Sequence, residues 1–354
     1  MDASLSDQTL RGLRRTITAS VLFLGLALAA VSGCAPIAPD SSQGMRDDSP
    51  AARLDSLVNQ DRRVAEASWR LATANASLCP VVRPRAGWTL QSANQYGAAL
   101  RPLAAARFGL DGDLPGLAAA PHGSPAERAG LSEGDLILAV NGRPLSIGRS
   151  GDAESFDGLA ANLAVLGQAE GEAQGLMSLT VRRNGREREV AVRPAPACAY
   201  IAQIEASADL NGRSDGRHIF ITSGLVTVAR NDDELAFFLA HEMAHAVLEH
   251  RTVPDVTGSR GSENALISTR RGLSSTAEAD ADRVGLYLLA RAGYDPEAAV
   301  QALAAYEAAD PMNRFAQLSL SGVRYLSPAA RRLALEPVVQ DIARRRRDGL
   351  SLIP

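Results

Sequence analysis

Two short motifs constrain this chain more than any other feature, and the first is the pentapeptide HEMAH from His241 to His245. It lies inside a strongly helical run, Asp232 to Glu249. At i, i+4 spacing the two imidazoles project from one face of a helix, about 6 Å apart, as two corners of a tetrahedral zinc site require. Glu242 lies beside them, where a carboxylate accepts a proton from a metal-bound water. A third ligand must come from elsewhere in the chain.

The second motif supplies that ligand. Residues from Ser275 to Leu289 predict another helix, on which Glu278 and Asp282 are four residues apart and share a face. We expect Glu278 to complete a site for one zinc ion per chain, and Asp282 to hydrogen-bond a ligand histidine and set its tautomer. A solvated acidic helix face is the alternative, which HExxH in the same region disfavours. His250 is expected to close the metal helix as a structural residue.

The N-terminus predicts export and lipidation. Three arginines precede an apolar run from about Ile17 to Val31, which is short for a membrane-spanning helix and ends just before Cys34. This ending resembles a bacterial lipobox, so residues 1–33 are expected to be a signal peptide and Cys34 to carry a lipid. The alternative is an ordinary secretory signal with an incidental cysteine. The expected location is the periplasmic side of the envelope, with Ala35 favouring the outer membrane over the inner.

The remaining cysteines predict a disulfide, and the net charge limits which partners are expected. Cys79 and Cys198 form an even pair in an oxidising compartment, which predicts a disulfide; two buried free thiols are the alternative. The formal net charge of −3 argues against nucleic acid as a partner. The membrane is expected to be contacted through the lipid anchor.

The chain is long enough for two folded domains. After the signal peptide we expect a flexible tether over 34–50, and an amphipathic helix and segment packing on the catalytic domain over 51–100. A glycine-rich, β-like region follows over 101–194, and the region that carries both metal motifs occupies 195–354. The strand-like run that begins at His218 is expected to edge the catalytic cleft and pair with substrate backbone.

The middle region resembles bacterial PDZ domains through GSPAERAGL, which begins at Gly123, and GDLILAVNGRPL, which begins at Gly134. This resemblance implies a small β-barrel that binds an extended peptide or a C-terminus by adding it to a sheet edge. The binding loop is expected at Phe108-Gly109-Leu110, with the stretch 114–117 as the alternative. A PDZ domain that serves only as a spacer or gate is a second alternative.

The metal motifs resemble a peptidase family. HEMAH, the preceding segment from Asp215 to Leu225, and EADADRVG from Glu278 to Gly285 resemble gluzincin metallopeptidases, the family of HtpX, mitochondrial Oma and the CAAX prenyl protease. The resemblance implies an α+β fold with a mainly helical zincin domain and a small sheet. It also implies zinc ligation by His241, His245 and Glu278, Glu242 as the general base and Asp282 as the orienting carboxylate.

Because relatives in the periplasm act in assembly and quality control, the expected function is zinc-dependent hydrolysis of peptide bonds in unfolded or misassembled envelope proteins. Relatives commonly carry a His-Pro pair followed by an arginine, and this chain has Ser327-Pro328 instead. The oxyanion is then expected to be stabilised by one of three residues, Tyr325, Arg324 or Arg332. The alternatives are a lipid-anchored PDZ peptide-binding or chaperone-like protein with a latent zinc domain, and a zinc hydrolase for a non-peptide substrate.

Overall fold

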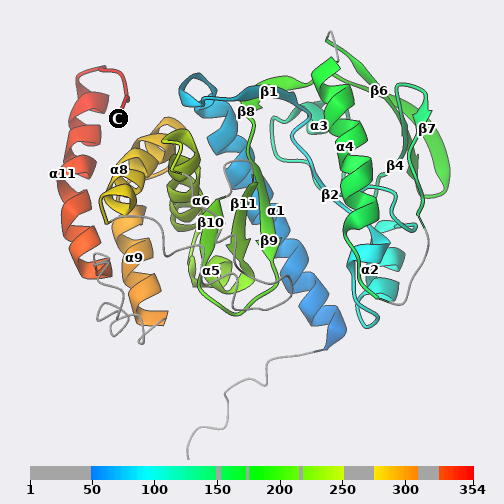
Figure 1. Cartoon of the computed structure of the whole chain (residues 1–354), viewed down its shortest axis with the longest axis horizontal. Helices are drawn as coiled ribbons and strands as arrows, with labels where there is room; N and C mark the ends of the chain where they lie inside the picture. Colours follow the sequence, from blue (N-terminus) through cyan, green and yellow to red (C-terminus); the bar gives the residue numbers. More distant parts are fainter. Residues whose placement is uncertain (1–48, 149–152, 173–174, 215–217, 251–274, 310–326) are drawn as a thin grey trace, which may run out of the picture. The chain divides into compact units, whose positions relative to one another are not determined.

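The computed structural model describes residues 49–148, 153–172, 175–214, 218–250, 275–309 and 327–354 (Figure 1). The chain divides into a unit of residues 1–46 and a compact unit of residues 47–354, and everything below concerns the second. The expected signal peptide, the lipidation site Cys34 and the tether up to residue 48 lie outside the described residues. None of the described helices is both long and apolar enough to cross a membrane.

Helix α1 (Pro50–Ala74) is the amphipathic helix that the sequence predicts. It begins where the Ser49 side chain accepts a hydrogen bond from the Ala52 amide, with Pro50 in its first turn. Its first half contributes Leu54 and Val58 to the core of the PDZ region, whereas its second half contributes three residues to the core around the metal motifs, Val64, Ala67 and Leu71. The helix therefore packs on the core around the metal motifs, as expected, and also on the PDZ core.

The PDZ region is built on a six-stranded antiparallel sheet with the order β2-β3-β4-β6-β7, and β5 pairs with β4. Its strands are β2 (Thr89–Gln91), β3 (Gly116–Ala119), β4 (Leu136–Val140), β5 (Arg143–Pro144), β6 (Met177–Arg183) and β7 (Arg186–Val192). Its helices are α2 (Arg101–Phe108), α3 (Pro125–Arg128) and α4 (Asp157–Glu172). Among the described residues the pairing is an open path with β2 and β7 at its edges, not the closed barrel expected. Because β2 pairs with β3, the sheet also starts upstream of residue 101.

The turns of this sheet follow the sequence closely. Asn141-Gly142 and Asn184-Gly185 all have positive φ, as a two-residue hairpin turn requires, and they join β4 to β5 and β6 to β7. Asp135 is fully buried just before β4, where Arg183 and Arg188 contact its carboxylate. These contacts compensate its buried charge and hold the β6–β7 hairpin against the start of β4.

The second core surrounds the metal motifs. Its three-stranded sheet has the order β10-β11-β9, formed by β10 (Gly212–Ser214), β11 (His218–Thr222) and β9 (Ile201–Glu205). Its helices are α5 (Ser223–Val228), α6 (Asp232–Val247), α8 (Ser275–Arg291), α9 (Ala298–Ala309) and α11 (Pro328–Arg347). The expectation that β11 edges the cleft was wrong, because β11 pairs with a strand on each side. Among the described residues the outer strands of this sheet are β10 and β9, and β10 packs against α6.

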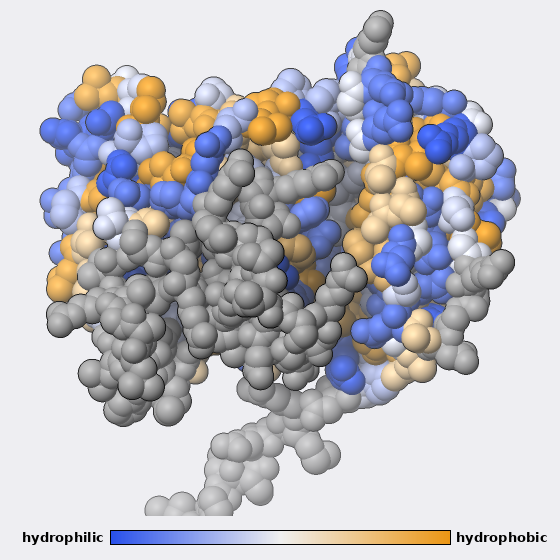
Figure 2. Space-filling model, viewed as in Figure 1, coloured by the Kyte–Doolittle hydropathy of each residue, from blue (hydrophilic) through white to orange (hydrophobic). Residues whose placement is uncertain are grey.

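The surface of the described residues is mixed in character. On the face drawn in Figure 2, hydrophobic residues are interspersed among hydrophilic ones, and the large hydrophobic side chains that remain exposed include Phe156, Leu176 and Leu333. Scattered exposure of this kind is ordinary for a folded protein.

A disulfide in the core around the metal motifs closes the base of the PDZ region. The predicted disulfide between Cys79 and Cys198 is present and spans 119 residues of sequence. Beside it, β1 (Val82–Arg85) pairs antiparallel with β8 (Ala195–Cys198), so the chain enters and leaves the PDZ region side by side. Closing a loop of this length restricts the unfolded chain by about 4 to 5 kcal/mol in the entropy model.

Asp61 lies on α1 between the last residue that α1 gives to one core and the first that it gives to the other. Its carboxylate is largely buried, and burial raises its pKa from 3.8 to about 6. The Tyr96 hydroxyl donates to Gln91 Oε1 at 2.5 Å. Burial raises the pKa of Tyr96, and the negative charge of Asp61 raises it further. Ionisation of Asp61 therefore works against the packing of α1.

We expect the Asp61→Asn variant to gain stability over the wild-type protein as pH rises from about 4 to 6. In that window the unfolded carboxyl has already lost its proton while the folded one retains it, so wild-type stability falls with pH. The gain is at most about 3 kcal/mol at about 1.4 kcal/mol per pKa unit. Urea unfolding at pH 4.5 and pH 7.5 measures it, with Asp55→Asn on the exposed part of α1 as the control. An equal effect of Asp61→Asn at both pH values would contradict the prediction.

Candidate metal centre

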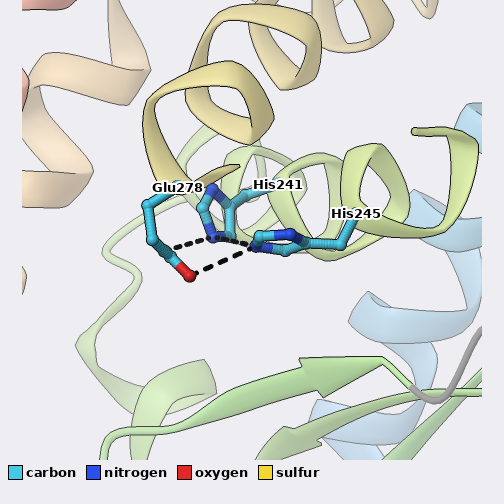
Figure 3. A group of neighbouring side chains, drawn as sticks. All are labelled: His241, His245 and Glu278. Atoms are coloured by element: carbon cyan, nitrogen blue, oxygen red, sulfur yellow. Dashed lines mark hydrogen bonds and ion pairs between the residues drawn. The ribbon is translucent and has the colours of Figure 1, made fainter. Parts of the chain in front are cut away.

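Two helices bring three metal-binding side chains to one point (Figure 3). His241 and His245 come from α6, and Glu278 comes from the first turn of α8. His241 Nε2 lies 3.2 Å from His245 Nε2, and Glu278 approaches both rings, with Oε2 3.4 Å from His241 Nε2 and Oε1 3.6 Å from His245 Nε2. One ligand atom from each residue lies within 4.8 Å of the others.

This donor set fits a zinc ion. Two imidazole nitrogens and one carboxylate are a frequent ligand set of catalytic zinc, which keeps a fourth position open for water or substrate. The two histidines are buried, and Glu278 keeps 19% of its side chain exposed. The open side of the cluster therefore lies on the side of the carboxylate. His241, His245 and Glu278 are the residues that would hold the ion.

The close approach of the two helices has a local cause in Gly285. A Cβ atom at this position of α8 would lie 3.1 Å from the backbone nitrogen of His241 and 3.2 Å from its Cα. Such distances are tighter than ordinary van der Waals contact, so any side chain here would push α8 away from α6. Glycine thus allows the two ligand-bearing helices to pack backbone against backbone.

Each ligand histidine is held through its other ring nitrogen. His241 Nδ1 lies 2.9 Å from Asp282 Oδ1, the contact expected from the sequence. Asp282 is itself gripped by Arg331, whose Nε and Nη2 donate to its two oxygens at 2.7 and 2.6 Å. His245 Nδ1 lies 3.2 Å from His250 Nδ1. These partners orient both rings so that the two Nε2 atoms face the same point.

The electrostatics of the cluster suit a cation. Burial raises the pKa of Glu278, but its hydrogen bond to His241 and the nearby charges outweigh burial and lower it to about 2. Burial lowers the pKa of His245, and the adjacent His241 lowers it further, to about 3. At neutral pH, Glu278 is therefore ionised and His245 neutral, the forms that bind metal. Burial lowers the pKa of His241, but its contacts with Asp282 and Glu278 outweigh burial and raise it to about 9, so a metal ion has to displace a proton from that ring. Asp282, despite its burial, is kept ionised by Arg331, which lowers its pKa.

The residue assigned as general base lies beside this cluster. Glu242 is buried on α6 and packs against the edge strand β10, where a Cβ on Gly212 would lie 2.5 Å from Glu242 Oε1. β10 thus passes close to the carboxylate.

Several other predicted residues are placed elsewhere. Arg332 forms an ion pair with Glu307 on α9, while Arg324 and Tyr325 lie outside the described residues. Arg331, which the sequence reading did not select, is the arginine that reaches the site. The sequence feature that could have pointed to Arg331 is Ser327-Pro328, which caps α11 and starts this helix one turn before Arg331. That pair predicts a helix start, although it does not say which arginine faces Asp282.

The predicted peptide-binding loop is also corrected. Phe108 ends α2 with its side chain in the PDZ core, Gly109 terminates that helix at a φ of 63°, and Leu110 is buried. These residues do not reach the strand edge expected of them. The alternative stretch, residues 114–117, leads into β3, which pairs with strands on both sides.

Comparison with known proteins agrees with this geometry. Peptidase family M48 matches residues 190–268, a range that includes β9, β10, β11 and α6, and the PDZ domain family matches residues 119–155. The mitochondrial metalloendopeptidase OMA1 of Saccharomyces cerevisiae is 29% identical over 103 residues, which are 24% of this chain and 30% of the yeast protein. The matched segment thus spans about a third of that relative. The resemblance drawn from the motifs is confirmed: this chain carries a domain of peptidase family M48 together with a PDZ domain.

Proposed function

We propose that this protein is a zinc-dependent endopeptidase. The observation that carries the proposal is the convergence of His241, His245 and Glu278 on one point with Glu242 beside it. Metal-assisted peptide hydrolysis needs a ligand set that leaves one metal position open, here two imidazoles and a carboxylate. It also needs a second carboxylate that does not bind the metal and can act as the base. The similarity to a metalloendopeptidase supports the same reaction.

The residues of the chain divide the work of this reaction. When bound, zinc would act as a Lewis acid and make a water molecule acidic. Glu242 accepts a proton from the attacking water and delivers it to the leaving amine. Asp282 holds the proton of His241 on Nδ1, so that Nε2 remains the ligand atom.

We further propose that the substrates are unfolded or misassembled envelope proteins, and that a lipid on Cys34 holds the enzyme on the periplasmic side of the envelope. The similarity to a metalloendopeptidase supports a protein substrate. The N-terminal motif supports the location. The disulfide supports an oxidising compartment.

Removal of metal is expected to abolish cleavage of casein by the chain from Ala35 onward. Dialysis against a chelator should reduce activity to background, and one equivalent of zinc per chain should restore it, since the three ligands form one site. Bound zinc is counted by atomic absorption in parallel. Cleavage that persists without metal would refute the metallopeptidase. Stoichiometric zinc without cleavage would instead favour the alternative, a PDZ peptide-binding protein with a latent zinc domain.

A further inference from the structure

The strand β2 forms one edge of the PDZ sheet. It pairs with β3 on its inner side, and no strand within the described residues pairs with its outer side. Leu90, in the middle of β2, is partly buried against the PDZ core, so the strand is firmly seated. An edge of this kind is a template for an added strand.

The direction of an added strand decides what meets the start of β2. A peptide added antiparallel to β2 would run opposite to it, so its C-terminal end would arrive at the residues that precede Thr89. Those residues are Ala86, Gly87 and Trp88, which connect β1 to β2. A free carboxylate there would need an unoccupied backbone amide to receive it.

The buried amide in this connection is already occupied. The Ala86 amide donates to Glu170 Oε1 at 2.8 Å, and Ala86 is fully buried. Glu170, near the end of α4, is only 5% exposed, and its Oε2 lies 3.7 Å from Arg85 Nε. A carboxylate from the protein itself therefore occupies one of the three amides at the place where an incoming C-terminus would seek a donor, and its charge lies beside the other two.

The connection has little room to rearrange. The Ala86 carbonyl accepts a hydrogen bond from the Ala126 amide at 2.9 Å. Gly87 has a φ of 71°, and a Cβ on it would lie 2.8 Å from the ring of Trp69 on α1 and from the Ser124 Cβ. Ala86 is thus held by hydrogen bonds at both its amide and its carbonyl, and the crowded Gly87 follows it.

The charge of Glu170 distinguishes a peptide that ends in a free carboxylate from an internal peptide segment. Burial raises the pKa of Glu170, while Arg85 and the Ala86 amide lower it. The Glu170 carboxylate thus has one cation and one amide as its partners. A second carboxylate beside Glu170 would face a like charge in a buried place, which is strongly unfavourable. An internal peptide segment brings a neutral peptide group to the same place and meets no such penalty.

We propose that the outer edge of β2 binds internal, extended segments of unfolded polypeptide and that Glu170 excludes free C-terminal carboxylates from it. The nature of the ligand rests on the proposed function, whereas the exclusion rests on the contacts of Glu170. The PDZ region would accordingly recruit substrates along their length and not by their ends.

The experiment measures binding on an array of 12-residue peptides tiled over casein, each made with a free C-terminal carboxylate and with a C-terminal amide. The protein is the chain from Ala35 onward with Glu242→Gln, so that nothing is cleaved. It should bind amide forms at least as well as free acids. Adding Glu170→Ala should free the Ala86 amide and raise the binding of free acids over amides about tenfold, equivalent to about 1.4 kcal/mol. Adding Glu170→Gln, which keeps an acceptor for the Ala86 amide and removes only the like charge, should bring a smaller gain than Glu170→Ala.

Three results would overturn the proposal. They are a tenfold preference of the unaltered edge for free acids, an absence of any change with Glu170→Ala in a protein that unfolds at the same temperature, and a failure to capture any peptide. Because the readout is binding by an inactivated protein, it stands apart from the proposed hydrolysis, whose failure appears only in the casein cleavage assay.

Discussion

Replacing Glu242 by glutamine should lower the rate of casein cleavage by about 10² to 10⁴-fold, the range that a general acid–base residue contributes. Glutamine has nearly the same size and keeps the packing against Gly212, but it cannot accept a proton. Glu242 does not belong to the cluster of His241, His245 and Glu278, so zinc should still bind at one ion per chain.

The measurement combines initial cleavage rates with zinc content by atomic absorption. Glu249→Gln is the matched control, because this exposed carboxylate follows the C-terminal end of the same helix. The control should retain both zinc and activity. If Glu242→Gln retained full activity, Glu242 would not be the base; if it lost zinc, its carboxylate would belong to the metal site.

Replacing Arg331 by methionine should be the most destabilising single change near the site. Arg331 donates two hydrogen bonds to Asp282, which is 2% exposed, so the variant leaves a buried carboxylate without its cation. Breaking a buried ion pair in this way costs about 3 to 5 kcal/mol. Because Asp282 also orients His241, zinc affinity should fall by about 10 to 100-fold.

Urea unfolding and a zinc competition titration measure the two effects. Arg332→Met is the matched control, since its partner Glu307 and the arginine itself are both partly exposed, and such a pair contributes only about 1 kcal/mol or less. The double variant Arg331→Met with Asp282→Asn should regain much of the stability, because no buried charge is left alone. It should not regain zinc affinity, because an amide holds the His241 tautomer less firmly. Equal behaviour of Arg331→Met and Arg332→Met would contradict this role.

The sequence alone predicted the parts of the site that depend on local spacing. His241 and His245 are one helical turn apart, as are Glu278 and Asp282, and helix geometry alone puts each pair on one face. The turns Asn141-Gly142 and Asn184-Gly185 were equally readable, because their conformation is local. The disulfide was predictable from the number of cysteines and the expected compartment.

Contacts between segments distant in sequence were decided by the tertiary structure. β11 became the central strand because β10 and β9 both pair with it, which its own alternation does not reveal. The edge strand of the PDZ sheet is β2, whose three residues are too few to stand out in the sequence. The segment around Phe108 instead forms the end of a helix that packs on the PDZ core.

The sequence by itself determined which residues are the candidate metal ligands, because ligand spacing along a helix is a property of the helix. Only the tertiary structure decided what surrounds those residues. Arg331 reaches Asp282 from α11, 49 positions away, and Glu170 reaches Ala86 across 84 positions. Neither pairing has a signature in local sequence, because each arises from the burial of a carboxylate that requires a donor, and the packing of distant elements determines which donor is close enough.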